Sequence, residues 1–313
     1  MRLFETIDIR EKFKNPVLTI GNYDGIHQGH RQIIERVKER AREISGTPML
    51  MTFDPHPLHI LGPDRELAAI TPREEKVRLI EEAGIEVLFV LPFTGEFARL
   101  SPEAFVASVL VERLAIKGLV IGYDFRFGSG GKGEIGLLRE LGAGYGFFVE
   151  VVEAVTVAGE KVGSNRIRKL VEEGDAAAVA KLLARPYAIE GTVVRAKGRG
   201  ATIGYPTINL RTDYSLIPKN GVYVTRVEIE GRSFGAVTNI GCNPTFEEGS
   251  ERSIESFILD FDGLLYGKLV RLHFLARIRD EAKFSSVDAL KARIAADVER
   301  ARTYFREEGE AGR

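Results

Sequence analysis

The sequence has little cysteine, no excess of charge of either sign and no long apolar run, and each shortage excludes a class of protein. Its one cysteine, Cys242, cannot form a disulfide within the chain. The Cys and His residues also form no cluster with the ligand spacing of a structural zinc site. We therefore expect a protein of the reducing cytoplasm that folds without disulfides or structural zinc.

Charge is almost balanced, with 44 lysines and arginines against 45 aspartates and glutamates. No block of like charge is long enough to bind nucleic acid, so we expect no nucleic-acid partner. Residues 1–15 alternate in charge where a signal peptide would be apolar, and no later segment approaches the length of a membrane span. We expect an unprocessed protein with no membrane partner; the sequence leaves its oligomeric state open.

A chain of 313 residues exceeds the usual size of one hydrophobic core, which favours two domains. In the first part, short apolar runs alternate with amphipathic stretches, and this alternation predicts an α/β domain with a doubly wound parallel sheet. Thr-Pro and Ser-Pro pairs open two of the amphipathic stretches, as at helix starts. The predicted strands are 17–20, 49–53, 87–91, 119–121 and 147–152, and the predicted helices are 33–44, 72–83 and 102–115.

The pattern changes at Arg185-Pro186, just after a short helix that Asp175 is predicted to cap. From there, strands follow one another with Glu-Gly and Asp-Gly turns between them, which predicts antiparallel pairing in a small barrel or sandwich. One C-terminal helix, from about residue 286 to 305, closes this domain. We therefore predict domains 1–184 and 185–313, the second with strands 187–194, 221–229, 234–239, 254–261 and 269–275.

The segment GNYDGIHQGH, residues 21–30, follows the first buried strand and leads into the first helix. Its glycines, Gly21, Gly25 and Gly29, allow a tight turn and close approach of a ligand, while the helix start supplies unpaired N–H groups. This context predicts a phosphate site in which His27 and His30 contact one phosphate chain. The alternative is that both histidines only cap the helix or face solvent.

Three further segments carry polar groups next to predicted strand ends or helix starts. In GYDFRFGSGGKG, residues 122–133, Asp124 can hold a polar ligand group and Arg126 a phosphate, while the phenylalanines belong more naturally to the core. His56 lies between two prolines, either in a structural turn or in contact with substrate. At a later helix start, Ser164 and Asn165 are predicted caps and Arg168 can reach a phosphate.

The H-x-G-H pattern resembles the nucleotidylyltransferase superfamily. TFDPHP (52–57), TPREEK (71–76), GYDFRFGSGGKG and GSNRIR (163–168) resemble, in the same order, the FMN adenylyltransferase module of prokaryotic bifunctional riboflavin kinase/FAD synthetases. The resemblance covers nearly the whole chain. It implies that FMN attacks the α-phosphorus of ATP, that Mg²⁺, His27, His30 and Arg168 orient the phosphates, and that His56 contacts the flavin. Further implied ATP contacts are Gly21, Asn22, Asp24, Gly25, Gly29, Asp124, Arg126, Ser164 and Asn165.

Asn165 departs from the family pattern, which usually has Ser-Ser-Thr where this chain has Gly163, Ser164 and Asn165. The missing hydroxyl weakens the expected pyrophosphate contact. It keeps open the alternative of a riboflavin kinase with a weakened or retargeted nucleotidyltransferase.

The second candidate site lies in GTVVRAKGRGATIGYPTIN, residues 191–209. Gly198, Arg199, Gly200 and Gly204 form a basic glycine-rich loop that can wrap phosphates, although it is not a Walker A loop. Two residues apart on an extended segment, Thr207 and Asn209 present oxygens on one side and can hold a hard cation. The alternative is a polar strand edge facing water.

Glu255 is the candidate base of this second site, because it shares a strand face with Phe257 and Leu259, which favours a raised proton affinity. A surface position on a strand edge is the alternative. With NIGCNPTF (239–246), the segment resembles the riboflavin kinase module. The resemblance implies that Glu255 accepts the proton of the ribityl 5′-hydroxyl and that Thr207 and Asn209 hold Mg²⁺.

The C-terminal segment resembles the part of the riboflavin kinase module that closes over the flavin. Arg279, Asp297 and Arg300 are the flavin contacts this implies, or else they belong to a solvated helix face. The predicted function is conversion of riboflavin to FMN and then FAD with ATP. The other alternative is an adenylyltransferase beside a non-catalytic flavin-binding barrel.

Overall fold

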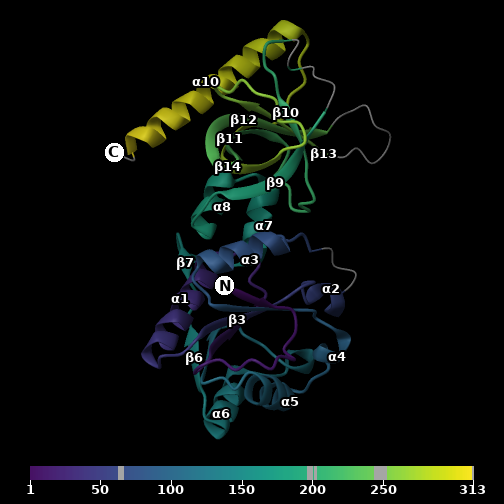
Figure 1. Cartoon of the computed structure of the whole chain (residues 1–313). Helices are drawn as coiled ribbons and strands as arrows, with labels where there is room; N and C mark the ends of the chain where they lie inside the picture. The colour runs from purple at the N-terminus through teal and green to yellow at the C-terminus, as the bar shows by residue number, and fades with distance from the viewer. Residues whose placement is uncertain (63–66, 196–199, 201–202, 243–251, 312–313) are drawn as a thin grey trace. The chain divides into compact units, whose positions relative to one another are not determined.

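The computed structural model describes residues 1–62, 67–195, 200, 203–242 and 252–311 (Figure 1). The predicted loop residues Gly198 and Arg199 lie outside the described residues. The chain forms two compact units, Met1–Ser164 and Asn165–Arg313. Within the described residues, no helix is long and apolar enough to cross a membrane.

The first unit contains a six-stranded sheet whose strands are all parallel, in the order β1-β4-β3-β2-β5-β6. Helices cover both faces, so the predicted doubly wound α/β domain is confirmed. One buried cluster packs α1 and α3 on one face, and another packs η1 and α6 on the other. The strands are β1 (Arg2–Phe4), β2 (Val17–Ile20), β3 (Pro48–Phe53), β4 (Val87–Leu91), β5 (Gly118–Gly122) and β6 (Phe148–Val152).

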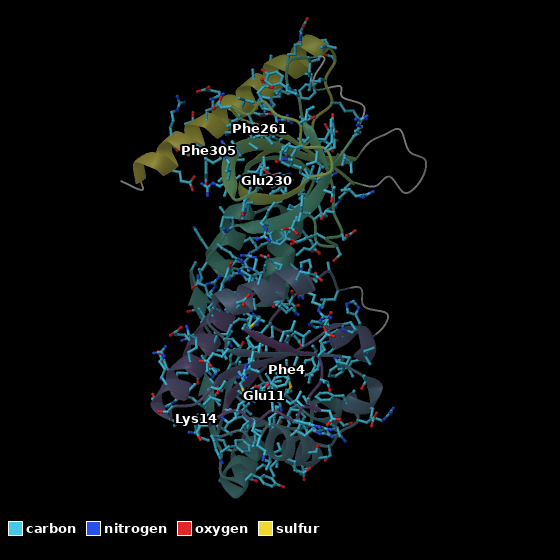
Figure 2. The ribbon with its side chains drawn as sticks, viewed as in Figure 1. Phe4, Glu11, Lys14, Glu230, Phe261 and Phe305 are labelled. Carbon is cyan, nitrogen blue, oxygen red and sulfur yellow. The ribbon has the colours of Figure 1, made fainter. Side chains whose placement is uncertain are left out.

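The edge strand β1 was not predicted, because its three residues are too short and too exposed to show an apolar pattern. It pairs in parallel with β4, and the ring centroids of Phe4, which is labelled in Figure 2, and of Phe89 are 5.4 Å apart. The helices of this unit are α1 (Gln28–Glu43), α2 (Leu58–Leu61), α3 (Arg73–Glu82), α4 (Gly95–Ala98), α5 (Pro102–Ala104), η1 (Phe105–Arg113), η2 (Ser129–Gly131) and α6 (Ile135–Tyr145), with a small β7 (Thr156–Val157) and β8 (Glu160–Lys161) hairpin.

The predicted helix 102–115 is one turn of α-helix, α5, followed by the π-helix η1. Its cap is as predicted: the Ser101 hydroxyl accepts the N–H of Ala104 at 3.1 Å. The buried side chains of η1 come in pairs four residues apart, Phe105 and Val106, then Val109 and Leu110. The apolar period predicts a helix here, but it does not distinguish an α-helical from a π-helical hydrogen-bond pattern.

The second unit contains a closed antiparallel barrel with strand order β10-β13-β12-β11-β14-β9. Strand β10 closes the barrel, because it pairs with both β13 and β9; the sequence indicated it only as an extended segment. Of the two predicted architectures, the barrel is the one observed. The elements are α7 (Ser164–Glu173), α8 (Ala176–Leu183), β9 (Tyr187–Val194), β10 (Ile208–Arg211), β11 (Gly221–Ile229), β12 (Arg232–Cys242), β13 (Arg252–Ile258), β14 (Leu269–Arg279) and α10 (Val287–Ala311).

Two helices, α7 and α8, precede the barrel, and α8 contacts β9 and β14. Asp175 caps α8 as predicted, since its Oδ1 accepts the N–H of Ala178 at 2.9 Å. The two compact units therefore divide at Ser164 and Asn165, before the predicted boundary at residue 185.

The C-terminal helix α10 packs on the outer face of β11 and β12. Phe305 lies over Gly235, where a Cβ would come within 2.6 Å of its ring, so only glycine allows this approach. The buried outer cluster joins Ala301 of α10 to Val222, Val224, Val237, Leu259 and Leu275.

Candidate functional site

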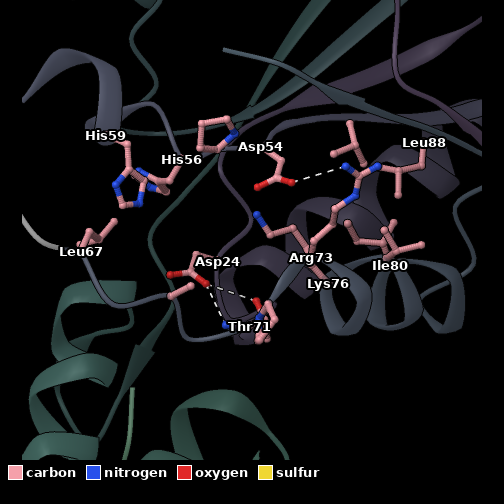
Figure 3. A pocket seen from close by; sticks show the side chains of 15 residues that line it. Asp24, Asp54, His56, His59, Leu67, Thr71, Arg73, Lys76, Ile80 and Leu88 are labelled. Atoms are coloured by element: carbon pink, nitrogen blue, oxygen red, sulfur yellow. Dashed lines mark hydrogen bonds and ion pairs between the residues drawn. The ribbon is translucent and has the colours of Figure 1, made fainter. Parts of the chain in front are cut away.

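The turn between β2 and α1 has an unusual backbone. Tyr23, Gly25 and Ile26 have φ angles of 48°, 96° and 39°, in the left-handed region that favours glycine. A turn with two non-glycine residues in this region persists only when its surroundings hold it. Figure 3 shows part of those surroundings.

The structure brings His27 and His30 together at the first turn of α1. Their rings stack with centroids 3.6 Å apart, and His27 Nδ1 accepts the N–H of His30 at 3.2 Å. His27 is thus the N-cap, and it is buried. Because Nδ1 accepts a hydrogen bond, the neutral ring carries its proton on Nε2, which can donate to a phosphate. Capping and phosphate binding are therefore compatible roles for this residue.

Asp24, predicted to contact ATP, holds the turn to a neighbouring segment. Its buried carboxylate accepts the N–H groups of Ile70 and Thr71, each at 3.0 Å, and the Thr71 hydroxyl at 3.2 Å. The same hydroxyl accepts the N–H of Gly25 at 3.0 Å. From the start of α7, the Ser164 hydroxyl donates to the Asp24 carbonyl at 2.8 Å. These contacts fix the turn.

Replacing Asp24 by alanine is expected to lower the free energy of unfolding of the first unit by about 1.5–3 kcal/mol, because buried N–H groups lose a charged acceptor. Hydrogen exchange of β2 and β3, followed by mass spectrometry, measures this loss. D124A, which removes an exposed carboxylate, is the control and should change exchange by no more than about 0.5 kcal/mol. Equal exchange in the D24A and D124A variants would contradict the anchoring role.

A cavity of about 160 Å³ lies beside the turn, lined among others by Asp24, Asp54, His56 and Lys76 (Figure 3). His56 Nδ1 accepts the N–H of Leu58 at 3.2 Å, so this ring lines the cavity while it also stabilises the local turn. His59 and Arg73 line it too, and Arg73 pairs with Asp54 at 3.5 Å.

Sequence reasoning missed Lys76. This residue of α3 is buried, and its Nζ donates to the Asn22 carbonyl at 3.1 Å. Burial lowers its pKa, against the opposing attraction of the Asp24 and Asp54 carboxylates. Its only signal in the sequence was a position at the end of the TPREEK segment.

Asp124 and Arg126 follow β5, at the same end of the sheet as the turn after β2, because both strands run in parallel. A Cβ on Gly122 would lie 3.3 Å from Asp124 Oδ1 and 3.4 Å from the end of Ile33 in α1. The carboxylate of Asp124 is therefore close to α1. Arg126 is exposed and paired with Glu134. Phe127 is buried against Phe105, as expected of a core residue.

In α7, Arg168 is buried and its Nη1 donates to Asn165 Oδ1 at 2.9 Å. The asparagine therefore orients the arginine. A threonine side chain is shorter and places its hydroxyl further from the guanidinium. Asn165 departs from the usual family residue but keeps a defined structural role.

In the barrel, strand register brings the second set of candidates into one row. Asn209 lies opposite Glu255, Glu255 opposite Asn239, Asn239 opposite Val222, and Val222 opposite Arg279. Residues directly opposite one another share a face of the sheet. That face is the outer one, because Val222 belongs to the cluster under α10. Asn239 is a polar member of this row to which the sequence assigned no role.

The strand around Glu255 alternates as predicted. Ile254, Ser256 and Ile258 are buried, whereas Glu255 and Phe257 are half-buried on the other face. Phe257 meets the Tyr205 ring edge-on at 5.3 Å. The carboxylate thus shares its face with aromatic side chains.

The described end of the glycine-rich loop lies against the Pro-Thr-Ile-Asn segment. A Cβ on Gly200 would lie 2.3 Å from the Tyr205 carbonyl oxygen and 3.2 Å from Thr207 Oγ1, so only glycine fits there. Gly204 has a φ of 88°, which also favours glycine. The described end of the loop therefore lies next to Thr207. Asn209, two residues further along, lies opposite Glu255 on the neighbouring strand.

Arg279 and Asp297, two predicted flavin contacts, bind each other. Arg279 Nη2 donates to Asp297 Oδ2 at 2.7 Å and its Nε donates at 3.0 Å, and the carboxylate is almost fully buried. The pair joins β14 to α10. Arg300 is exposed, and its Nη1 donates to the Ile278 carbonyl at 3.4 Å.

D297A is expected to lower the free energy of unfolding of the second unit by about 3–5 kcal/mol, because the Arg279 guanidinium loses the buried carboxylate that accepts its hydrogen bonds. Hydrogen exchange of β14 and α10 measures this effect. The exposed neighbour Glu299 supplies the control variant, E299A, for which no comparable change is expected. A D297A protein with exchange like that of wild type would show that the pair does not hold α10.

The chain is similar over both units to known proteins. Residues 9–166 match the family model of FAD synthetase, and residues 183–305 match that of riboflavin kinase. A bifunctional riboflavin kinase/FMN adenylyltransferase of Bacillus subtilis is 37% identical over 302 residues, 95% of each chain. One of Escherichia coli is 36% identical over 290 residues, 92% of each. A crystal structure described as a macrolide-efflux protein from Streptococcus pneumoniae has a TM-score of 0.88 at 32% identity and covers 96% of this chain and 98% of its own.

Proposed function

The chain belongs to the family of bifunctional riboflavin kinase/FMN adenylyltransferases, and from this premise we propose that its two sites act in sequence. The second unit phosphorylates riboflavin to FMN, and the first unit adenylylates FMN to FAD. One observation carries the proposal: each proposed module, 1–184 and 185–313, has its own family match and its own cluster of candidate phosphate-binding residues. We keep the module boundary at residues 184 and 185 as a proposal, since the two matches leave 167–182 unassigned.

In adenylyl transfer, an oxygen of the FMN phosphate attacks the α-phosphorus of ATP. The bond from that phosphorus to the β-phosphate oxygen breaks, and pyrophosphate leaves with the electron pair. His27 donates from Nε2 to the phosphates, His30 lies in the same stack, and Arg168 neutralises the charge that develops. The proposed ATP contacts are Gly21, Asn22, Gly25, Gly29, Asp124, Arg126, Ser164 and Asn165, with Asp24 holding the turn from within.

In the kinase reaction, Glu255 accepts the proton of the ribityl 5′-hydroxyl, whose oxygen attacks the γ-phosphorus of ATP. The bond to the β-phosphate oxygen breaks and ADP leaves. The N–H groups of the loop that includes Gly200 and Gly204 bind the phosphates, together with Gly198 and Arg199.

The oxygens of Thr207 and Asn209 are hard donors that suit Mg²⁺, which takes most of its remaining ligands from phosphates and water. When bound, Mg²⁺ neutralises phosphate charge.

Riboflavin, FMN and ATP are the proposed substrates. We propose His56 as a flavin contact in the first unit and Arg279 and Arg300 in the second, with Asp297 orienting Arg279. The proposed location is the cytoplasm.

Purified protein supplied with riboflavin, ATP and Mg²⁺ should yield FMN and then FAD on chromatography. FMN supplied with ATP should yield FAD and pyrophosphate directly. If neither flavin product forms, the proposal fails. If only FMN forms, the first unit has a different or weakened activity.

A further inference from the structure

Among the residues that the structure describes, the first unit contains a buried ammonium, that of Lys76, which the proposed chemistry does not use. We propose that Lys76 is a positioning residue for adenylyl transfer: its ammonium holds the turn 21–26 in the conformation that presents His27 to the phosphates. This inference rests on the proposed adenylyltransferase function. It concerns a residue that acts through the turn.

Two donors converge on the Asn22 carbonyl. Lys76 Nζ donates to it at 3.1 Å from α3, and the Thr52 hydroxyl donates at 3.0 Å from the end of β3. Asn22 directly precedes Tyr23, the first residue of this turn with a left-handed φ. A carbonyl held from two elements fixes the peptide plane at the entry to the strained turn.

The segment 71–76, which carries Lys76, also holds the far end of the turn. Gly25 donates its N–H to the Thr71 hydroxyl at 3.0 Å, and Thr71 lies just before α3, which carries Lys76. Residues 71–76 therefore bind both ends of the left-handed stretch. Two residues later, His27 caps α1 and stacks on His30. A shift at Asn22 would thus be transmitted to the imidazoles.

Packing alone does not account for a lysine at this position. Burying an ammonium costs free energy, whereas a methionine of similar length would fill the same space without that cost. The carboxylates of Asp24 and Asp54 partly offset the cost, and the side chain lies between them in Figure 3. The ammonium therefore donates to the Asn22 carbonyl and offsets the negative charge of Asp24 and Asp54 beside the cavity.

The surroundings of Lys76 also make the contact sensitive to pH. Asp24 faces the ammonium from the turn after β2 and Asp54 from the end of β3; Arg73 of α3, His56 and His59 line the same cavity. Burial lowers the pKa of Lys76 despite the two acids. A lowered pKa means that the ammonium loses its proton at a less alkaline pH than a free lysine. Adenylyl transfer should therefore fall as the pH rises through this pKa.

The test uses the full chain and two variants, K76M and K76R, with FMN and ATP as substrates between about pH 7 and 10. K76M should lower kcat for FAD formation about 10- to 100-fold, as misplacement of catalytic groups does. K76R should recover most of the rate and shift the alkaline fall to higher pH, because arginine stays charged. Riboflavin phosphorylation by the second unit should be unchanged in both, as should FAD formation by K12M, which removes an exposed lysine.

FAD formation by K76M at the wild-type rate would overturn the inference. If K76M does not fold, K76R decides: an alkaline fall at the same pH as in wild type would equally overturn it. Absence of FAD formation by the wild-type protein is a different result, because it refutes the proposed function itself.

Discussion

E255Q is expected to slow riboflavin phosphorylation about a hundredfold or more, with FMN adenylylation unchanged. Glutamine keeps the size of the side chain but cannot accept a proton. Glu255 lies opposite Asn209 in β10 and Asn239 in β12, so one substitution removes the carboxylate from the centre of the candidate row. ADP release with riboflavin as acceptor measures the kinase rate, and FAD formation from supplied FMN measures the other activity in the same chain.

E228Q supplies a matched control, because Glu228 is an exposed glutamate on strand β11 of the same barrel. It should leave both rates as they are. A non-catalytic flavin-binding barrel predicts that E255Q and E228Q behave alike. Loss of both activities in E255Q would instead indicate a general folding defect.

H27N is expected to lower FMN adenylylation about a hundredfold or more, since the shorter asparagine amide cannot place a donor where the imidazole Nε2 stands. Asparagine is among the best N-cap residues, so the start of α1 should be preserved. H27A removes both the donor and the cap, and it should additionally cost about 0.5–2 kcal/mol of stability. FAD formation and thermal unfolding of both variants separate the two roles of His27.

Riboflavin phosphorylation should continue at the wild-type rate in both histidine variants. If H27N forms FAD as fast as wild type while H27A is slow and less stable, His27 acts only as a helix cap. The alternative that both histidines are merely structural would then hold.

Local signals in the sequence predicted much of the fold. The apolar runs of β2, β3 and β4 are fully buried, so every position shows the pattern of a central parallel strand. In β9 and β13, buried and half-buried residues alternate, because one face of each strand points into the barrel. Other elements gave weaker signals. Strands β1 and β10 are short and only partly buried, so neither shows a continuous apolar run, and η1 shares its apolar spacing with an α-helix.

By itself, the sequence determined the two-unit plan, the Gly-rich turn with His27 and His30, and the strand that carries Glu255, because each depends on neighbours within one segment. Only the tertiary structure decided which distant side chains meet. The row from Asn209 to Arg279 depends on the register of five strands, the pairing of Arg279 with Asp297 depends on the docking of α10, and the contact of Lys76 with Asn22 joins residues 54 positions apart. No local pattern encodes such contacts, since they follow from strand pairing and packing of the whole unit.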